Sequence, residues 1–141
     1  MRAHLASCAV LAAVLLSPIE LGAGAGEAPP ASFRAVPLLR TGVSGDTSRD
    51  AIVARGEFPP GATTGPHTHP GDEYAYVLEG TLELLAEGRP PRRVTAGAAY
   101  HNPRGVVHET RNVGDDTARV VSTFVLEKGR PIIEPAAVSS R

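Results

Sequence analysis

A series of short β-prone runs, each bounded by glycine or proline turn signals, extends from residue 50 to residue 128 and strongly limits what this chain can fold into. The runs are AIVARGEF (51–58), EYAYVLEG (73–80), TLELLAEG (81–88), PRRV (91–94), GVVHETRNV (105–113) and ARVVSTFVLEK (118–128). No window of the chain shows a sustained helical period. Short strands at regular intervals, separated by Gly/Pro turns, predict an all-β fold, either a sandwich or a small barrel.

Two of these runs, residues 73–80 and 81–88, follow each other without a gap. Glu79-Gly80 lies between them and has the composition of a tight turn. The sequence therefore predicts that these two runs are neighbouring strands joined as a hairpin.

The stretch GPHTHPGDE (65–73) combines two histidines and a glutamate around a Pro-Gly turn. Successive side chains of a strand alternate between its faces, so His67 and His69 point the same way with Cα atoms roughly 6–7 Å apart. Two imidazoles at that separation can both reach one ion at about 2.0–2.1 Å. Pro70-Gly71-Asp72 has turn chemistry that can bring Glu73 beside them. The alternative is a solvated loop in which the histidines are incidental.

A third histidine, His108, lies in the run GVVHETRN, on the same strand face as Val106, Thr110 and Asn112. If its strand lies beside the segment that carries His67 and His69, the site contains three imidazoles and one carboxylate. This additional partner favours a metal site over the incidental loop.

Two longer patterns resemble the conserved motifs of the cupin superfamily. Residues 61–80, GATTGPHTHPGDEYAYVLEG, match the first motif: glycine, five residues, His-x-His, three residues, glutamate, six residues, glycine. Residues 97–112, GAAYHNPRGVVHETRN, match the second: glycine, five residues, Pro-x-Gly, two residues, histidine, three residues, asparagine. With their neighbouring strands, the motifs account for residues 50–128, and the sequence resembles a small single-domain cupin.

The resemblance implies a small β-barrel of the jelly-roll type with its site inside. By position it implies that His67, His69, Glu73 and His108 are the metal ligands. It also implies turn or packing positions rather than chemistry for the motif residues Gly61, Gly80, Gly97, Pro103, Gly105 and Asn112.

Three imidazoles and one carboxylate suit a divalent transition metal, and ligand type alone does not choose among the candidates. The resemblance favours iron or manganese, with zinc, nickel or copper as alternatives. Cupins with this ligand set include dioxygenases, lyases and isomerases, so the first hypothesis is a metal-dependent enzyme acting on a small oxygenated molecule that chelates the metal. The alternatives are a binding module that captures a small ligand without converting it, and a structural or storage cupin.

Beyond the ligands, the sequence offers few candidates for acid–base chemistry. Glu73 could shuttle a proton, and His101 could act as a general base, although a loop histidine at the barrel mouth is the favoured interpretation. Tyr76 and Tyr100 could line the pocket and donate a hydrogen bond to a substrate oxygen, or serve only in packing.

The ends of the chain differ in composition from the strand-rich middle. Residues 1–25 have the layout of a secretory signal peptide, with basic Arg2, an apolar run over residues 5–16 and a small-residue cleavage pattern at residues 23–25. We therefore expect a secreted or periplasmic protein, and removal of this segment also removes Cys8, the only cysteine. Residues 26–49 are expected to be an N-terminal arm or linker, and residues 129–141 a tail along the outside.

The charge and the aromatic content limit the partners. The net charge is −1 and there is no basic cluster, which argues against a nucleic-acid partner. Nothing after the signal peptide has the pattern of a membrane span. With three Phe, three Tyr and no Trp, the core is light, so we expect a homodimer. The apolar tail segment PIIEP (131–135) could contribute to the dimer interface or cap one barrel end.

Overall fold

The structure is a computed structural model that describes residues 32–136. The expected signal peptide and Cys8 lie outside the described residues. Within them the chain forms ten β-strands and no helix, so there is no helical segment that could cross a membrane. The strands are β1 (Arg34–Val43), β2 (Asp46–Phe58), β3 (His67–Thr68), β4 (Gly71–Glu79), β5 (Thr81–Ala86), β6 (Arg92–Thr95), β7 (Ala99–Asn102), β8 (His108–Asn112), β9 (Ala118–Glu127) and β10 (Glu134–Pro135).

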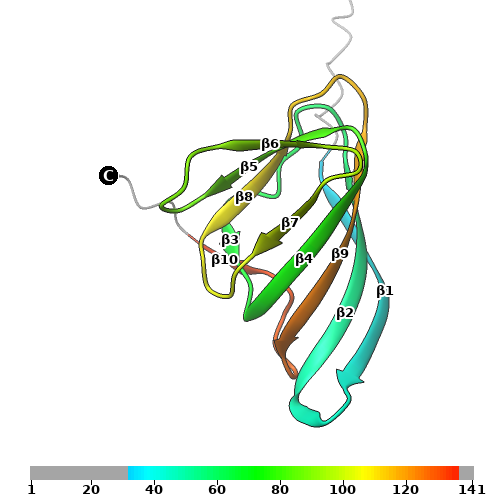
Figure 1. Cartoon of the computed structure of the whole chain (residues 1–141), viewed down its shortest axis with the longest axis vertical. Helices are drawn as coiled ribbons and strands as arrows, with labels where there is room; N and C mark the ends of the chain where they lie inside the picture. The colour runs from blue at the N-terminus through cyan, green and yellow to red at the C-terminus, as the bar shows by residue number, and fades with distance from the viewer. Residues whose placement is uncertain (1–31, 137–141) are drawn as a thin grey trace, which may run out of the picture.

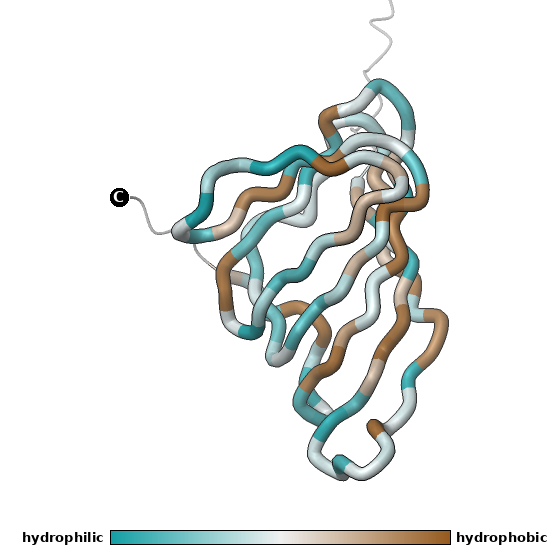
Figure 2. The backbone as a smooth tube through the Cα atoms, in the orientation of Figure 1, coloured by the Kyte–Doolittle hydropathy of each residue, from teal (hydrophilic) through white to brown (hydrophobic). Residues whose placement is uncertain are grey.

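The strands form two five-stranded antiparallel sheets (Figure 1), in the orders β1-β2-β9-β4-β7 and β10-β3-β8-β5-β6. Buried and less buried residues alternate along β9 over its whole length. Figure 2 colours the same backbone by hydropathy, and hydrophobic (brown) and hydrophilic (teal) segments are interspersed along the strands. The two sheets bury their inner faces against each other, which confirms the predicted all-β jelly-roll barrel.

The interior contains two apolar clusters with a polar layer between them. The larger cluster includes Phe58, Val77 and Leu82, and the smaller one consists of Ile52, Ala54, Phe124 and Leu126. On β9, Val120 belongs to the larger cluster and Phe124 to the smaller, and buried Ser122 lies between them. The candidate site occupies this polar layer.

The predicted hairpin at Glu79-Gly80 is wrong. β4 pairs with β7 and β9, whereas β5 pairs with β6 and β8, so the two runs belong to different sheets. Gly80 has a φ of 83° and carries the chain from one sheet to the other. The same local turn chemistry serves a hairpin and a corner between sheets. The strand pairing that distinguishes them is made by residues far away in the sequence.

Both ends of the described chain join the sheets. Residues 34–49, expected as part of an arm, form β1 and the start of β2, which pair as a hairpin around Gly45. β1 is almost entirely exposed, so its backbone pairing with β2 holds it rather than an apolar pattern. In the expected outer tail, β10 pairs with β3, and Ile132 packs against the smaller apolar cluster. Part of the tail therefore covers one end of the barrel.

Candidate metal centre

The candidate ligands come from both sheets and are buried between them. His67 lies on β3, His69 directly follows that strand, and His108 begins β8. His67 and His108 are paired residues on neighbouring strands, which confirms the strand arrangement on which the predicted site depended. Glu73 faces them from β4 in the other sheet, and all four side chains belong to residues that are 2–7% exposed.

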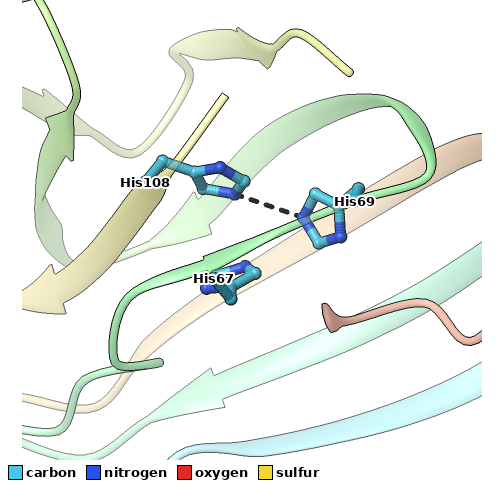
Figure 3. Close-up of side chains that lie close together, drawn as sticks. All are labelled: His67, His69 and His108. Carbon is cyan, nitrogen blue, oxygen red and sulfur yellow. Dashed lines mark hydrogen bonds between the residues drawn. The ribbon is translucent and has the colours of Figure 1, made fainter. Parts of the chain in front are cut away.

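The three imidazole rings converge on one point (Figure 3), and their candidate ligand atoms all lie within 4.8 Å of one another. The Nε2 atoms of His69 and His108 are 3.2 Å apart. Oε2 of Glu73 lies 3.4 Å from Nε2 of His69 and 3.7 Å from Nε2 of His108. The structure therefore brings together all four residues predicted as ligands.

The Nδ1 atom of each imidazole contacts a backbone carbonyl oxygen on the side of the ring away from the other ligands. Nδ1 of His67 lies 2.9 Å from the carbonyl oxygen of Gly65, and Nδ1 of His108 lies 2.9 Å from that of Val106. Nδ1 of His69 lies 2.5 Å from the carbonyl oxygen of Ile132, in the tail. Because a carbonyl oxygen only accepts, Nδ1 must donate in all three contacts, and in a neutral ring the Nε2 lone pair then faces the site.

This arrangement has the donor chemistry of a cation site. In the neutral rings, the lone pairs of His69 and His108 face each other at 3.2 Å, with a carboxylate oxygen beside them and no proton on either nitrogen. Facing lone pairs repel unless a cation lies between them. Three nitrogen donors and one oxygen donor at this separation fit a divalent transition metal.

The protonation states of His108, His67 and Glu73 also suit a metal site. Burial, which disfavours the charged form, and the neighbouring His67 and His69 together lower the pKa of His108 to about 4. Burial also lowers the pKa of His67. Burial by itself raises the pKa of Glu73. The interaction with His69 and the hydrogen bonds from Ser122 and Asn102 outweigh this effect and bring the pKa to about 2. At neutral pH, His67 and His108 are therefore neutral and Glu73 is ionised, the forms that bind a metal.

Two residues that the sequence reasoning missed hold the carboxylate of Glu73. The Ser122 hydroxyl donates to Oε1 at 2.7 Å, and the Asn102 side-chain amide donates to Oε2 at 2.7 Å. A signal for Ser122 was present in the sequence, because it is the one polar residue at an inward position of β9, among Val120, Phe124 and Leu126.

Two of the predicted catalytic residues lie elsewhere. Tyr76 is 48% exposed on the outer face of β4, because the inward positions of that strand are 71, 73, 75 and 77. His101 points outward from β7, where it contacts Asp72 at 2.9 Å and stacks on Tyr74 with ring centroids 4.8 Å apart. Neither side chain reaches the histidine cluster, so the assignment of both to catalysis at this centre is corrected.

Tyr100, in contrast, points into the barrel from the inward face of β7. Burial, followed by the charge of the nearby Glu73, raises the pKa of Tyr100 far above its ordinary value. Its hydroxyl therefore remains protonated and can donate a hydrogen bond near the site.

Deleting residues 130–141 should weaken metal binding by about 10- to 100-fold, the usual effect of losing a hydrogen-bond partner of a ligating histidine. The deletion removes the Ile132 carbonyl that orients His69. Competition with a coloured chelator measures the affinity. Ile132→Ala is the matched control, because it removes the apolar packing of Ile132 and retains the carbonyl. Wild-type affinity in the deleted chain would contradict an orienting role for the tail.

Comparison with known proteins identifies the family. The Cupin domain family model matches residues 54–124. Germin-like protein 1-1 of Oryza sativa is 40% identical over 77 residues, which is 51% of this chain and 36% of that protein. Nectarin-1 of Nicotiana plumbaginifolia is 37% identical over 100 residues, 67% of this chain and 40% of that protein. Dimethylsulfoniopropionate lyase DddQ of Ruegeria pomeroyi is 37% identical over 71 residues, 50% of this chain and 35% of that protein. The chain spans less than half the length of these curated relatives.

Solved structures agree with the fold. A protein with a double-stranded β-helix domain from Klebsiella pneumoniae superposes with a TM-score of 0.61 at 20% identity, covering 77% of this chain and 90% of that chain. Oxalate oxidase in complex with the substrate analogue glycolate superposes with a TM-score of 0.60 at 28% identity, covering 75% of this chain and 56% of that chain. With both motifs matched and its three histidines gathered in the barrel, the chain belongs to the cupin family.

Proposed function

We propose that this protein is a mononuclear metal-dependent enzyme that acts on a small oxygenated organic molecule able to bind the metal. His67, His69, His108 and Glu73 hold the ion, and iron or manganese is the favoured occupant. The observation that carries the proposal is the convergence of three imidazoles and an ionised carboxylate on one buried point. Two relatives support the substrate class, since one is named an oxalate oxidase and another a dimethylsulfoniopropionate lyase.

A divalent metal bound by four protein ligands supplies a Lewis acid with positions left open for a chelating molecule. The protein's own groups then have separate tasks. Ser122 and Asn102 keep Glu73 ionised and oriented. The protonated Tyr100 hydroxyl can donate to an oxygen that enters the site, and the apolar clusters on both sides limit the access of water.

The test is metal analysis followed by turnover. The mature chain, residues 26–141, is purified without chelators, loaded with iron or manganese, and assayed for oxygen uptake with oxalate and glycolate and for acrylate release from dimethylsulfoniopropionate. We expect one metal per chain and turnover of a small chelating acid, both lost in His108→Ala and retained in Thr95→Ala, a change at an exposed position of β6. Ligand binding without turnover would favour a non-catalytic binding module, and absence of metal uptake would overturn the proposal.

We also infer that the mature protein is secreted or periplasmic, because residues 1–25 have the layout of a signal peptide.

We infer a homodimer formed through the outer face of the sheet that contains β4. One row of that face runs across four strands through Leu39, Val53, Thr123 and Tyr74, which are paired residue by residue. Leu39 and Tyr74 are more than half exposed, and Tyr76 is nearly so. Apolar and aromatic side chains gathered on one sheet face are typical of a protein–protein interface.

The double substitution Leu39→Asp/Tyr76→Asp should convert the dimer into a monomer, because it places two charges in an apolar interface. Light scattering coupled to size exclusion reports the molar mass. Thr95→Asp, on the outer side of the other sheet, is the control and should leave the mass unchanged. A wild-type protein that is monomeric at high concentration would refute the dimer.

A further inference from the structure

A cavity of about 300 Å³ lies between β5, β6 and β7. β6 and β7 are the end strands of the two sheets, so no strand pairing closes the barrel between them. One side-chain hydrogen bond spans this opening, from the guanidinium of Arg92 on β6 to the carbonyl oxygen of Ala99 on β7 at 3.3 Å. A volume of this size accommodates a small organic ligand.

The floor of the cavity adjoins the candidate metal centre. Tyr100 and Asn102 line it. The Asn102 amide donates to the same Glu73 oxygen that faces His69 and His108. A ligand in the cavity would therefore touch the side chain that orients Glu73.

The rim is positively charged without compensation. Arg89 and Arg92 line the cavity together with His101, which contacts Asp72 outside it, and none of the lining residues is acidic. Within the part of the chain that the structure describes, the carboxylates that form ion pairs contact other bases, and none pairs with Arg89 or Arg92. A guanidinium presents a planar set of donors that matches a carboxylate.

The walls between rim and floor are apolar. They are formed by Leu84 and Ala86 of β5 and by Pro90 and Pro91 of the connection to β6. A ligand that fits this cavity needs a charged end for the arginines and an apolar body for the walls.

We propose that this cavity binds a small organic carboxylate with a short apolar body. Arg89 and Arg92 hold the carboxylate, and the opposite end of the molecule lies against Tyr100 and Asn102. This inference deepens the proposed function. The binding of the carboxylate does not depend on that function, but its identification as the substrate rests on it.

In the experiment, metal-free, full-length mature protein is titrated with benzoate. Calorimetry measures the binding, and NMR measures the chemical-shift changes of the cavity residues. Saturable benzoate binding is expected, with shifts at Tyr100 and Asn102, and the neutral analogue benzamide should bind at least about tenfold more weakly. Arg89→Gln/Arg92→Gln should weaken benzoate binding about 10- to 100-fold. Arg93→Gln is the matched control, because Arg93 lies on the same strand and does not line the cavity.

Arg92 also donates a hydrogen bond to β7, so the double variant could lose stability. If it does not fold, Arg89→Gln alone serves as the test, with a several-fold loss of benzoate affinity expected. Absence of saturable benzoate binding, equal binding of benzamide, or unchanged affinity in the arginine variants would overturn the proposal. Metal-free protein separates the two hypotheses. Benzoate binding in a chain that takes up no metal would refute only the proposed function, and metal uptake without benzoate binding would refute only the cavity.

Discussion

Replacing His69 by alanine should lower the affinity for a divalent metal by about 100-fold or more. Losing a hydrogen-bond partner of a ligand already reduces affinity by about 10- to 100-fold, and this change removes a ligand itself. The Nε2 atom of His69 faces both His108 and Glu73, and its Nδ1 donates a hydrogen bond to the tail. Elemental analysis after dialysis and competition with a chelator measure the loss.

The same substitution should abolish stabilisation by metal. A metal at 100 times its dissociation constant stabilises a folded protein by about 2.7 kcal/mol. In a domain of this size that corresponds to a rise in melting temperature of roughly 10–20 °C. His69→Ala should show almost no rise at the same metal concentration. His101→Ala, on the outer surface, is the matched control and should behave as wild type. A metal-dependent rise in His69→Ala equal to that of wild type would refute the assignment of the ligand.

Replacing Gly71 by alanine should destabilise the metal-free protein by about 3 kcal/mol or more, a severe case of overpacking. A Cβ atom at this position would lie 2.0 Å from the carbonyl oxygen of Val125 and 2.7 Å from Cα of Leu126. Both are backbone atoms of β9, which pairs with β2 on one side and β4 on the other. The strand cannot move away without weakening those pairings, so the clash cannot relax cheaply. Urea unfolding monitored by circular dichroism measures the change.

Gly42→Ala is the matched control, because Gly42 also lies in a strand and its added Cβ would have no neighbour within 4 Å. Its free energy of unfolding should change by no more than about 0.5 kcal/mol. A Gly71→Ala protein whose unfolding free energy lies within about 1 kcal/mol of wild type would show that β9 is more deformable than its two pairings suggest.

Gly71 also illustrates how far sequence reasoning reaches. From the sequence it belongs to a Pro-Gly-Asp turn that folds Glu73 back toward the histidines. Glu73 does lie beside them, but Gly71 is the first residue of β4, and it is required there because β9 passes so close. Close approach of a distant strand leaves no trace in the residues around the glycine.

Strand alternation explains both a success and an error. It places Glu73 on the inner face of β4, and the same rule, applied three residues further, places Tyr76 outside, as the structure shows. On β7 the alternation puts Tyr100 and Asn102 inside and His101 outside, but its starting phase is unknown until the pairing with β4 is known. The residues that support Glu73 were therefore missed, although Ser122 stood out on its apolar strand.

The sequence by itself determined the all-β fold, the two cupin motifs and the four candidate ligands, because periodicity and motif spacing are properties of residues close together in the chain. Tertiary structure decided that Gly80 turns between sheets, that the tail reaches back to His69, and that two arginines border a cavity beside Glu73. These features depend on contacts between segments far apart in the sequence. Only the pairing and packing of whole strands sets such contacts.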